Sequence, residues 1–212
     1  IINSSYNSRL DLYAEHVVRG DITAADGTVL AKTTVNDDGC ETREYPYGRM
    51  FAHVVGYMNN GKGGLESQYN FNLLRSHSFF LTQIINDLKN KKNIGDTLVT
   101  TLDYDVQETA YKALGDRDGA VVVMEVKTGK ILALVSKPDF DPNTLAERWD
   151  DIVSDENSSV LLNRVTSGLY PPGSTFKIFT TLEYVHENSN YQDYSFDCEG
   201  ELNVDGNETV SY

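Results

Sequence analysis

Short apolar segments separated by turn residues make up the first sixty residues of the chain. Segment 22–31 places Asp26 and Gly27 between two apolar runs. Because glycine adopts positive φ at little cost, this arrangement favours a β-hairpin. The sequence therefore predicts a small β element in this region.

Between about residues 64 and 92 the spacing of the apolar positions lengthens and becomes typical of partly helical structure. These positions are Leu65, Tyr69, Phe71, Leu73, Leu74, Phe79, Leu81, Ile84, Ile85 and Leu88. The polar run 89–93 then interrupts the pattern with three lysines. We interpret this run as a solvated loop or a boundary between domains.

A strand followed by a helix is predicted after Gly95. The apolar character of residues 97–102 favours a strand, and Asp103 is a suitable N-cap because its carboxylate can accept hydrogen bonds from free backbone N–H groups. The helix is expected to end at Gly115.

Two apolar runs, 120–126 and 131–135, follow this helix and are joined by the turn sequence 127–130. Near-continuous apolar runs are typical of strands covered on both faces, so we expect both strands to be heavily buried. Strand, helix and hairpin in this order predict the start of an α/β domain with an antiparallel sheet. We therefore divide the chain into residues 1–95 and 96–212.

Composition narrows the functional classes. The chain has 212 residues, 40% of them hydrophobic and 24% charged, which is ordinary for a globular protein. A formal net charge of -14 would repel a polyanion, so nucleic acid is excluded as a partner.

No run approaches the roughly 20 apolar residues that span a bilayer. The chain opens at Ile1 rather than at a Met, and we expect that an upstream segment, such as an anchor or a signal, was removed.

Cysteine and histidine residues are sparse. Cys40 and Cys198 are too few for a disulfide framework, and both a single bridge and two free thiols remain open. The four histidines show no spacing typical of a metal site.

The strongest candidate chemistry lies at Ser174 and Lys177. Pro171-Pro172-Gly173 cannot continue a helix from upstream, whereas residues 175–186 have helical spacing, so a helix is expected to begin at or beside Ser174. Residues three positions apart share a helix face, which can bring the lysine amine toward the serine hydroxyl. The positive end of the helix dipole favours negative charge on oxygen, and a partly desolvated lysine releases its proton more readily. Both effects would activate the serine.

The spacing Ser-x-x-Lys is a loose pattern that arises by chance in a chain of this composition. A helix-capping serine followed by a surface lysine is the structural alternative. The Pro-Pro-Gly sequence before Ser174 and the helix start there make the arrangement more specific than the spacing alone.

At this motif the chain resembles the class B, monofunctional penicillin-binding proteins, since Ser-x-x-Lys is a signature of penicillin-binding enzymes. The resemblance covers nearly the whole chain in the order of the family. It rests on Val18–Ile22, 25–27, 30–31 and 64–66, which resemble the N-terminal pedestal, and on 136–143, 163–164 and 170–177, which resemble landmarks of the transpeptidase domain. The resemblance implies an α+β fold, with a small mixed α/β pedestal or dimerisation-type domain at 1–95 and an incomplete transpeptidase domain, an antiparallel sheet with helices, at 96–212.

Two later motifs of the family, Ser-x-Asn and Lys-Thr-Gly, have no counterpart after Lys177. Lys127-Thr128-Gly129 precedes Ser174 and is interpreted as a turn, and Ser154-Asp155-Glu156 as an exposed acidic loop. We expect the chain to be the front portion of a longer enzyme and to be inactive by itself.

The family resemblance implies a D,D-transpeptidase in which Ser174 attacks a peptidoglycan stem peptide, or a β-lactam, with Lys177 as general base. It implies no metal and no organic cofactor, partners among cell-wall synthesis proteins, and a place on the outer face of the bacterial cytoplasmic membrane, anchored by a segment outside this chain. A class D β-lactamase or β-lactam sensor domain is one alternative. A non-catalytic interaction module of the cell-wall machinery is the other.

Overall fold

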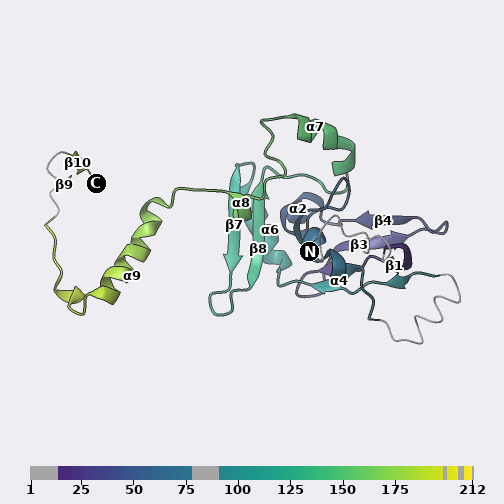
Figure 1. Cartoon of the computed structure of the whole chain (residues 1–212), viewed down its shortest axis with the longest axis horizontal. Helices are drawn as coiled ribbons and strands as arrows, with labels where there is room; N and C mark the ends of the chain where they lie inside the picture. Colours follow the sequence, from purple (N-terminus) through teal and green to yellow (C-terminus); the bar gives the residue numbers. More distant parts are fainter. Residues whose placement is uncertain (1–13, 78–90, 198–199, 205–207, 212) are drawn as a thin grey trace. The chain divides into compact units, whose positions relative to one another are not determined.

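A computed structural model describes residues 14–77, 91–197, 200–204 and 208–211. The chain divides into two compact units, residues 1–168 and 169–212, which are described separately below. Figure 1 shows the helices and strands of both. In the described residues, no helix has the length and apolar character needed to cross a membrane.

A four-stranded sheet forms the first part of the first unit. Its order is β4 (Glu41–Glu44), β3 (Val29–Val35), β2 (Ile22–Thr23) and β6 (Leu98–Val99). Strand β3 pairs antiparallel with both β2 and β4, and β2 pairs parallel with β6. A separate parallel pair joins β1 (Val17–Val18) to β5 (Asn93–Ile94).

The predicted hairpin is confirmed. Strands β2 and β3 pair on either side of the turn, where Gly27 adopts a φ of +90°. Asp26 holds the turn, because its carboxylate accepts a hydrogen bond of 2.9 Å from the backbone N–H of Thr28.

Short helices pack against this sheet. They are η1 (Gly48–Phe51), α2 (Ala52–Val55), α3 (Gly64–Gln68) and α4 (Asn70–Leu73). The core between helices and sheet consists of Ile22, Ala24, Leu30, Ala31, Tyr45, Phe51, Val55, Leu73 and Leu102. The predicted helical structure is confirmed for residues 64–73, whereas Phe79, Leu81, Ile84, Ile85 and Leu88 lie outside the described residues. Lys91 and Lys92 are exposed, as expected of a solvated run.

The predicted helix after Gly95 is α6 (Tyr104–Leu114). Asp103 caps it, since its side chain accepts a hydrogen bond of 3.0 Å from the Val106 N–H, and Gly115 ends it with a φ of +60°. The strand expected over 97–102 is shorter in the structure, where β6 covers only Leu98–Val99.

The two apolar runs form the antiparallel pair β7 (Gly119–Met124) and β8 (Ile131–Lys137). Helix α6 covers one face of this pair, and its residue Ala110 packs with Ala133 and Val135 of β8. The expectation of heavy burial is wrong for β7, in which Val122 is 48% and Met124 54% exposed. Its apolar residues point to both faces in turn: Val121 and Val123 pack in the cluster with Ala110 of α6, whereas Val122 and Met124 lie on the more exposed face.

The rest of the first unit consists of η2 (Leu145–Arg148), α7 (Trp149–Ser154) and α8 (Arg164–Ser167). A small core forms where Ala52 of α2 packs with Phe140 and Leu145. The predicted α+β class is confirmed, with mixed helices and sheets throughout this unit.

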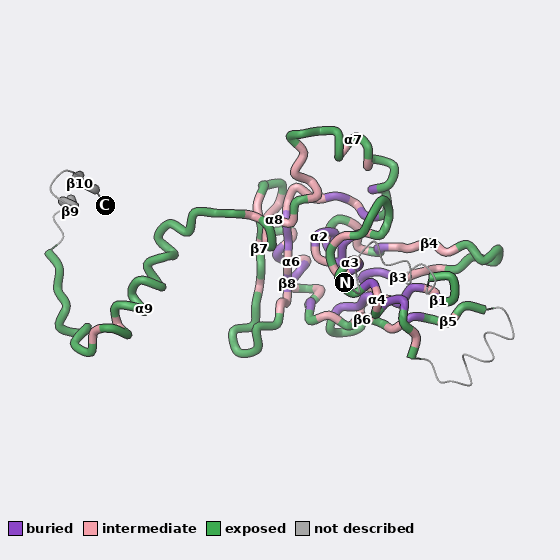
Figure 2. The backbone as a smooth tube through the Cα atoms, in the orientation of Figure 1, coloured by how far each residue is buried: buried purple, intermediate pink, exposed green. Residues whose placement is uncertain are grey.

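The second unit contains η3 (Gly173–Phe176), α9 (Lys177–Glu187), η4 (Tyr191–Asp193) and the antiparallel hairpin of β9 (Glu201–Val204) and β10 (Glu208–Ser211). No residue of α9 is buried. Figure 2 shows this helix as exposed along almost its whole length.

Candidate active site

Ser174 lies in a single turn of 3₁₀-helix that leads directly into α9. Gly173 begins this turn with a φ of +53°, a conformation that glycine adopts without steric cost. The backbone N–H of Lys177 donates to the carbonyl oxygens of Ser174 and Thr175. The expected helix start beside Ser174 is therefore confirmed, and Lys177 follows one turn later as the first residue of α9.

The side chains of this turn are open to solvent. Ser174 and Lys177 are both exposed. The Thr175 hydroxyl donates to the Pro172 carbonyl at 2.5 Å and thereby fixes the entry of the chain into the turn. Over the described residues, no hydrogen bond joins the Ser174 hydroxyl to the Lys177 amine, so the approach of the amine to the hydroxyl stays a prediction.

Large apolar side chains surround the pair on the helix. Phe176, Ile178, Phe179 and Leu182 are between 54% and 65% exposed. Because adjacent residues are separated by about 100° around the helix axis, these four positions fall on one broad face, roughly 160° wide. An apolar face of this width is typical of a helix that packs against a protein core.

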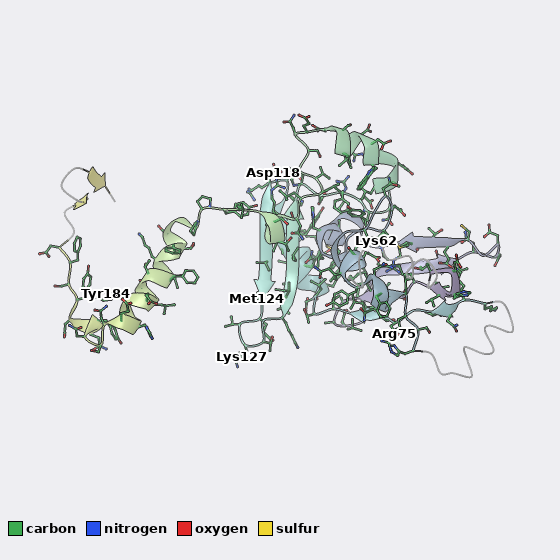
Figure 3. All side chains as sticks on the ribbon, viewed as in Figure 1. Lys62, Arg75, Asp118, Met124, Lys127 and Tyr184 are labelled. Carbon is green, nitrogen blue, oxygen red and sulfur yellow. The ribbon has the colours of Figure 1, made fainter. Side chains whose placement is uncertain are left out.

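The two motif-like sequences that precede Ser174 have the structures expected of them. Lys127, Thr128 and Gly129 form the turn of the β7–β8 hairpin, where Gly129 has a φ of +75° and its N–H donates to the Glu125 carbonyl. Figure 3 shows Lys127 at the tip of this hairpin. Ser154 ends α7, and residues 154–156 are exposed.

A buried charge cluster joins two of the pedestal landmarks, and sequence reasoning missed it. Glu66 is fully buried and lies 2.5 Å from the guanidinium of Arg19 and 2.8 Å from that of Arg43. Arg19 also donates to the Asn70 side chain at 2.6 Å. Burial lowers the pKa of Arg19, and the Glu66 carboxylate acts in the opposite direction. The sequence offered one signal for this cluster. Arg19 and Glu66 carry opposite charges, and each is flanked by apolar or glycine residues, as in Val18-Arg19-Gly20 and Gly64-Leu65-Glu66.

Other contacts join residues 45–49 to residues 139–143 within the first unit. The Asn143 side chain accepts from the Tyr45 N–H at 2.9 Å and donates to the Tyr45 carbonyl at 3.0 Å, so it pairs with the backbone as a neighbouring strand would. Arg49 forms an ion pair of 3.1 Å with Asp139. These contacts fix residues 139–143 against Tyr45 and Arg49.

A cluster of metal-binding side chains does not accompany these residues in the described part of the chain. Groups of three or more His, Cys, Asp or Glu side chains that could hold a metal ion are absent there. Cys40 is exposed, and Cys198 lies outside the described residues.

Comparison with known families matches both parts of the sequence. Residues 19–98 match the penicillin-binding protein A dimerisation domain. Residues 119–209 match the penicillin-binding protein transpeptidase domain.

Two curated relatives are peptidoglycan D,D-transpeptidases. PbpA of Mycolicibacterium smegmatis is 36% identical over 189 residues, an alignment that covers 81% of this chain and 38% of the relative. MrdA of Acinetobacter baumannii is 32% identical over 176 residues, which cover 68% of this chain and 26% of the relative. The chain thus spans well under half of the length of these relatives.

Solved structures give the same picture. The D,D-transpeptidase domain of a peptidoglycan glycosyltransferase from Eggerthella lenta has a TM-score of 0.77 and 35% identity, over 92% of this chain and 43% of that one. Penicillin-binding protein A of M. tuberculosis, solved as an imipenem acyl-enzyme complex, has a TM-score of 0.78 and 29% identity, over 93% of this chain and 49% of that one. The two domain matches, the relatives and the shared fold agree that this chain belongs to the class B penicillin-binding proteins.

Proposed function

We propose that the protein is a peptidoglycan D,D-transpeptidase in which Ser174 is the nucleophile and Lys177 its general base. The observation that carries the proposal is the turn at Ser174, which places the serine at the start of a helix and the lysine one turn later. This turn lies inside the segment that matches the transpeptidase domain.

The chemistry follows from these two side chains. Ser174 Oγ attacks the carbonyl of the penultimate D-alanine of a stem peptide, and its proton passes to the neutral amine of Lys177. The C–N bond then breaks, and the departing D-alanine takes up this proton on its nitrogen. An amine of a second stem peptide then attacks the resulting ester and gives a proton to the neutral amine of Lys177. The ester C–O bond breaks, Ser174 Oγ takes up this proton, and the new amide bond is the cross-link. The Ser174 backbone N–H is a suitable hydrogen-bond donor to the carbonyl oxygen of the substrate, which becomes negatively charged when Ser174 attacks.

A β-lactam would enter the same first step. Its strained amide would acylate Ser174 as the ring opens, and the product would stay bound as an ester. The relative from M. tuberculosis has been solved as acyl-enzymes with imipenem and with penicillin G, which supports this expectation. No metal or organic cofactor takes part in these steps.

The division into a pedestal at 1–95 and a transpeptidase portion at 96–212 is part of the proposal. It is supported by the separate matches at 19–98 and 119–209. We further propose that the protein acts on the outer face of the bacterial cytoplasmic membrane, together with other cell-wall synthesis proteins.

The exposed apolar residues of α9 indicate that further protein atoms cover this helix in the active enzyme. Such a cover would also exclude water from around Lys177. The 212-residue chain by itself should therefore react slowly with penicillin.

Labelling with a fluorescent penicillin, followed by mass spectrometry, tests the proposal. The full-length protein should form an adduct on Ser174 that disappears in Ser174→Ala, whereas Ser154→Ala should label as the wild type does. An adduct that survives Ser174→Ala would refute the assignment, and no adduct at all on the wild type would favour an interaction module. Rapid release of hydrolysed drug would instead favour a β-lactamase, an alternative that the relatives described above do not support.

A further inference from the structure

We propose that Asn60 is a site of spontaneous covalent modification: the backbone nitrogen of Gly61 attacks its side-chain amide, ammonia leaves, and water converts the resulting ring to aspartate or isoaspartate. The inference goes beyond the transpeptidase reaction and does not depend on it, since the step needs only these two residues and water. The site lies in the loop 57–63 between α2 and α3, within the first unit.

The dipeptide Asn60-Gly61 is the place where the sequence favours this step. Glycine has no Cβ, so its backbone nitrogen approaches the preceding side chain with less steric hindrance than that of any other residue. The sequence contains no other asparagine that is directly followed by glycine. Asparagine is also one of the thermolabile residues of proteins. The local chemistry therefore singles out this asparagine among those of the chain.

The tip of the loop is open to solvent. Asn59, Asn60, Gly61 and Lys62 are all exposed, so water reaches the ring that would form. Within the part of the chain that the structure describes, neither the Asn60 side chain nor the Gly61 N–H has a hydrogen-bond partner. A Cβ placed on Gly61 would meet no described atom within 4 Å. No described group therefore holds the two reacting groups apart.

The backbone of the tip explains why this labile pair stands here. Asn60 has a φ of +56° and Gly61 a φ of +112°. Positive φ is uncommon for residues with a Cβ, but asparagine adopts it more readily than most, and glycine adopts it without steric cost. The turn thus favours the two residue types that react most easily when they are adjacent.

The base of the loop is fixed, in contrast to its tip. The Gly63 N–H donates to the Tyr57 carbonyl at 3.1 Å and closes the loop, and the Gly56 N–H donates to the Ala52 carbonyl of α2 at 2.8 Å. A Cβ on Gly56 would lie only 1.9 Å from the Gly63 carbonyl oxygen, so the two ends of the loop are in close contact. A chemical change at the tip should therefore leave the fold intact.

The atoms of the step balance. The Gly61 nitrogen forms a bond to Cγ of Asn60, and its proton passes to the amide nitrogen, which leaves as ammonia when the C–N bond breaks. The product is a cyclic imide. Water opens this ring at Cγ to give aspartate, or at the backbone carbonyl carbon to give isoaspartate. The first step is intramolecular, so its two reactants are already adjacent.

The modification changes the charge of the loop. Lys62, which Figure 3 labels, carries the one formal charge of residues 57–63, so a carboxylate at position 60 would bring their net charge to zero. Tyr57, Lys62 and Gly63 line a cavity of about 470 Å³. The charge of the loop beside this cavity would therefore change as the protein ages.

Incubation of the full-length protein at pH 8, followed by digestion with trypsin, tests the proposal. Cleavage after Arg49 and Lys62 isolates residues 50–62. We expect this peptide to gain the mass difference between an amide and a carboxylic acid, and fragmentation should place the gain at residue 60. An isoaspartyl methyltransferase should label part of the product. Because the tip is unrestrained, the rate should lie within about tenfold of that of a synthetic peptide of residues 50–62.

Two substitutions in the same loop provide the controls. Asn60→Gln should keep its mass, because the ring formed from glutamine is larger and closes more slowly. The matched control is Asn59→Gln, which replaces the neighbouring exposed asparagine and should convert at the wild-type rate. Both variants should keep the melting temperature of the wild type, since neither side chain is buried.

The possible outcomes decide the inference. An unchanged peptide, a rate more than about tenfold below that of the synthetic peptide, or a gain of mass at Asn59 instead of Asn60 would overturn it. Aspartate without any isoaspartate would also overturn it, because opening of the cyclic imide gives both. None of these results bears on Ser174, whose labelling by penicillin is measured separately.

Discussion

Arg19 and Glu66 form a fully buried ion pair although they lie 47 positions apart, and Arg43 binds the other oxygen of the same carboxylate. The side chains of all three are at most 5% exposed. One carboxylate therefore compensates two guanidinium groups inside the pedestal.

Glu66→Gln should destabilise the pedestal strongly. It leaves two buried cations without a counter-charge, which costs about 3–5 kcal/mol of the free energy of unfolding. Urea denaturation followed by circular dichroism measures the change. The control is Glu108→Gln, which breaks the exposed pair of Glu108 with Lys112 and should cost no more than about 0.5 kcal/mol. Equal losses in the two variants would contradict the role assigned to Glu66.

The buried His53 should make stability fall in mild acid. Burial lowers the pKa of His53 below its ordinary 6.5, and the Pro138 carbonyl and Asp139 oppose this only in part. The unfolded chain therefore binds a proton that the folded chain does not. The stability that the folded protein has with neutral His53 is fully present above pH 6.5, the ordinary pKa. This stability is lost as the pH falls from there toward the lower pKa of His53 in the folded chain.

Urea midpoints at pH 7.5 and 5.5 check this expectation. The decrease between the two values should be smaller in His53→Gln, which cannot titrate. Arg164 also faces His53 and adds to the lowering, so Arg164→Gln should reduce the decrease slightly. An identical decrease in the wild type and in His53→Gln would exclude His53 as the source.

The cap of α6 should contribute measurably to stability. Asp103→Ala removes the acceptor of the Val106 N–H and should cost about 1 kcal/mol of the free energy of unfolding. Asp103→Asn should retain most of the stability that Asp103→Ala loses, because asparagine is an equally good N-cap. Thermal and urea denaturation of the two variants would show the difference, and a loss of the same size in both would point to the charge rather than the cap.

The exposed residues of α9 give a prediction that depends on chain length. In the 212-residue chain, Phe179 is 65% exposed, so Phe179→Ala should leave the melting temperature nearly unchanged. In the full-length protein we expect the same substitution to cost about 3 kcal/mol, since the helix would be covered there. Phe140→Ala should destabilise both, because Phe140 is 4% exposed in the first unit. A small effect of Phe179→Ala in the full-length protein would argue against the cover.

Local features of the fold could be predicted from the sequence. The turn at Asp26-Gly27 and the helix from Asp103 to Gly115 follow from the backbone preferences and hydrogen-bonding groups of a few adjacent residues. The same holds for the helix start beside Ser174, where Gly173 and the two prolines before it restrict the backbone.

Long-range relationships could not be predicted in this way. Nothing near Arg19 in the sequence identifies Glu66 as its partner, and nothing near Asn163 identifies His53. The apolar run of β7 shows that both of its faces can be buried, but burial requires a neighbouring element on each face. In the described structure α6 covers the face that carries Val121 and Val123, and the exposure of Val122 and Met124 on the other face was not predictable from the run itself.

The bonds from Tyr45 to Asn143 and from His53 to Asn163 also bear on the order of folding, because they close loops of 98 and 110 positions. Closing such long loops is entropically costly and slows folding. A nascent chain that has been synthesised only to residue 95 has neither partner available. The pedestal should therefore reach its final protection against hydrogen exchange and proteolysis only after residue 163 has left the ribosome.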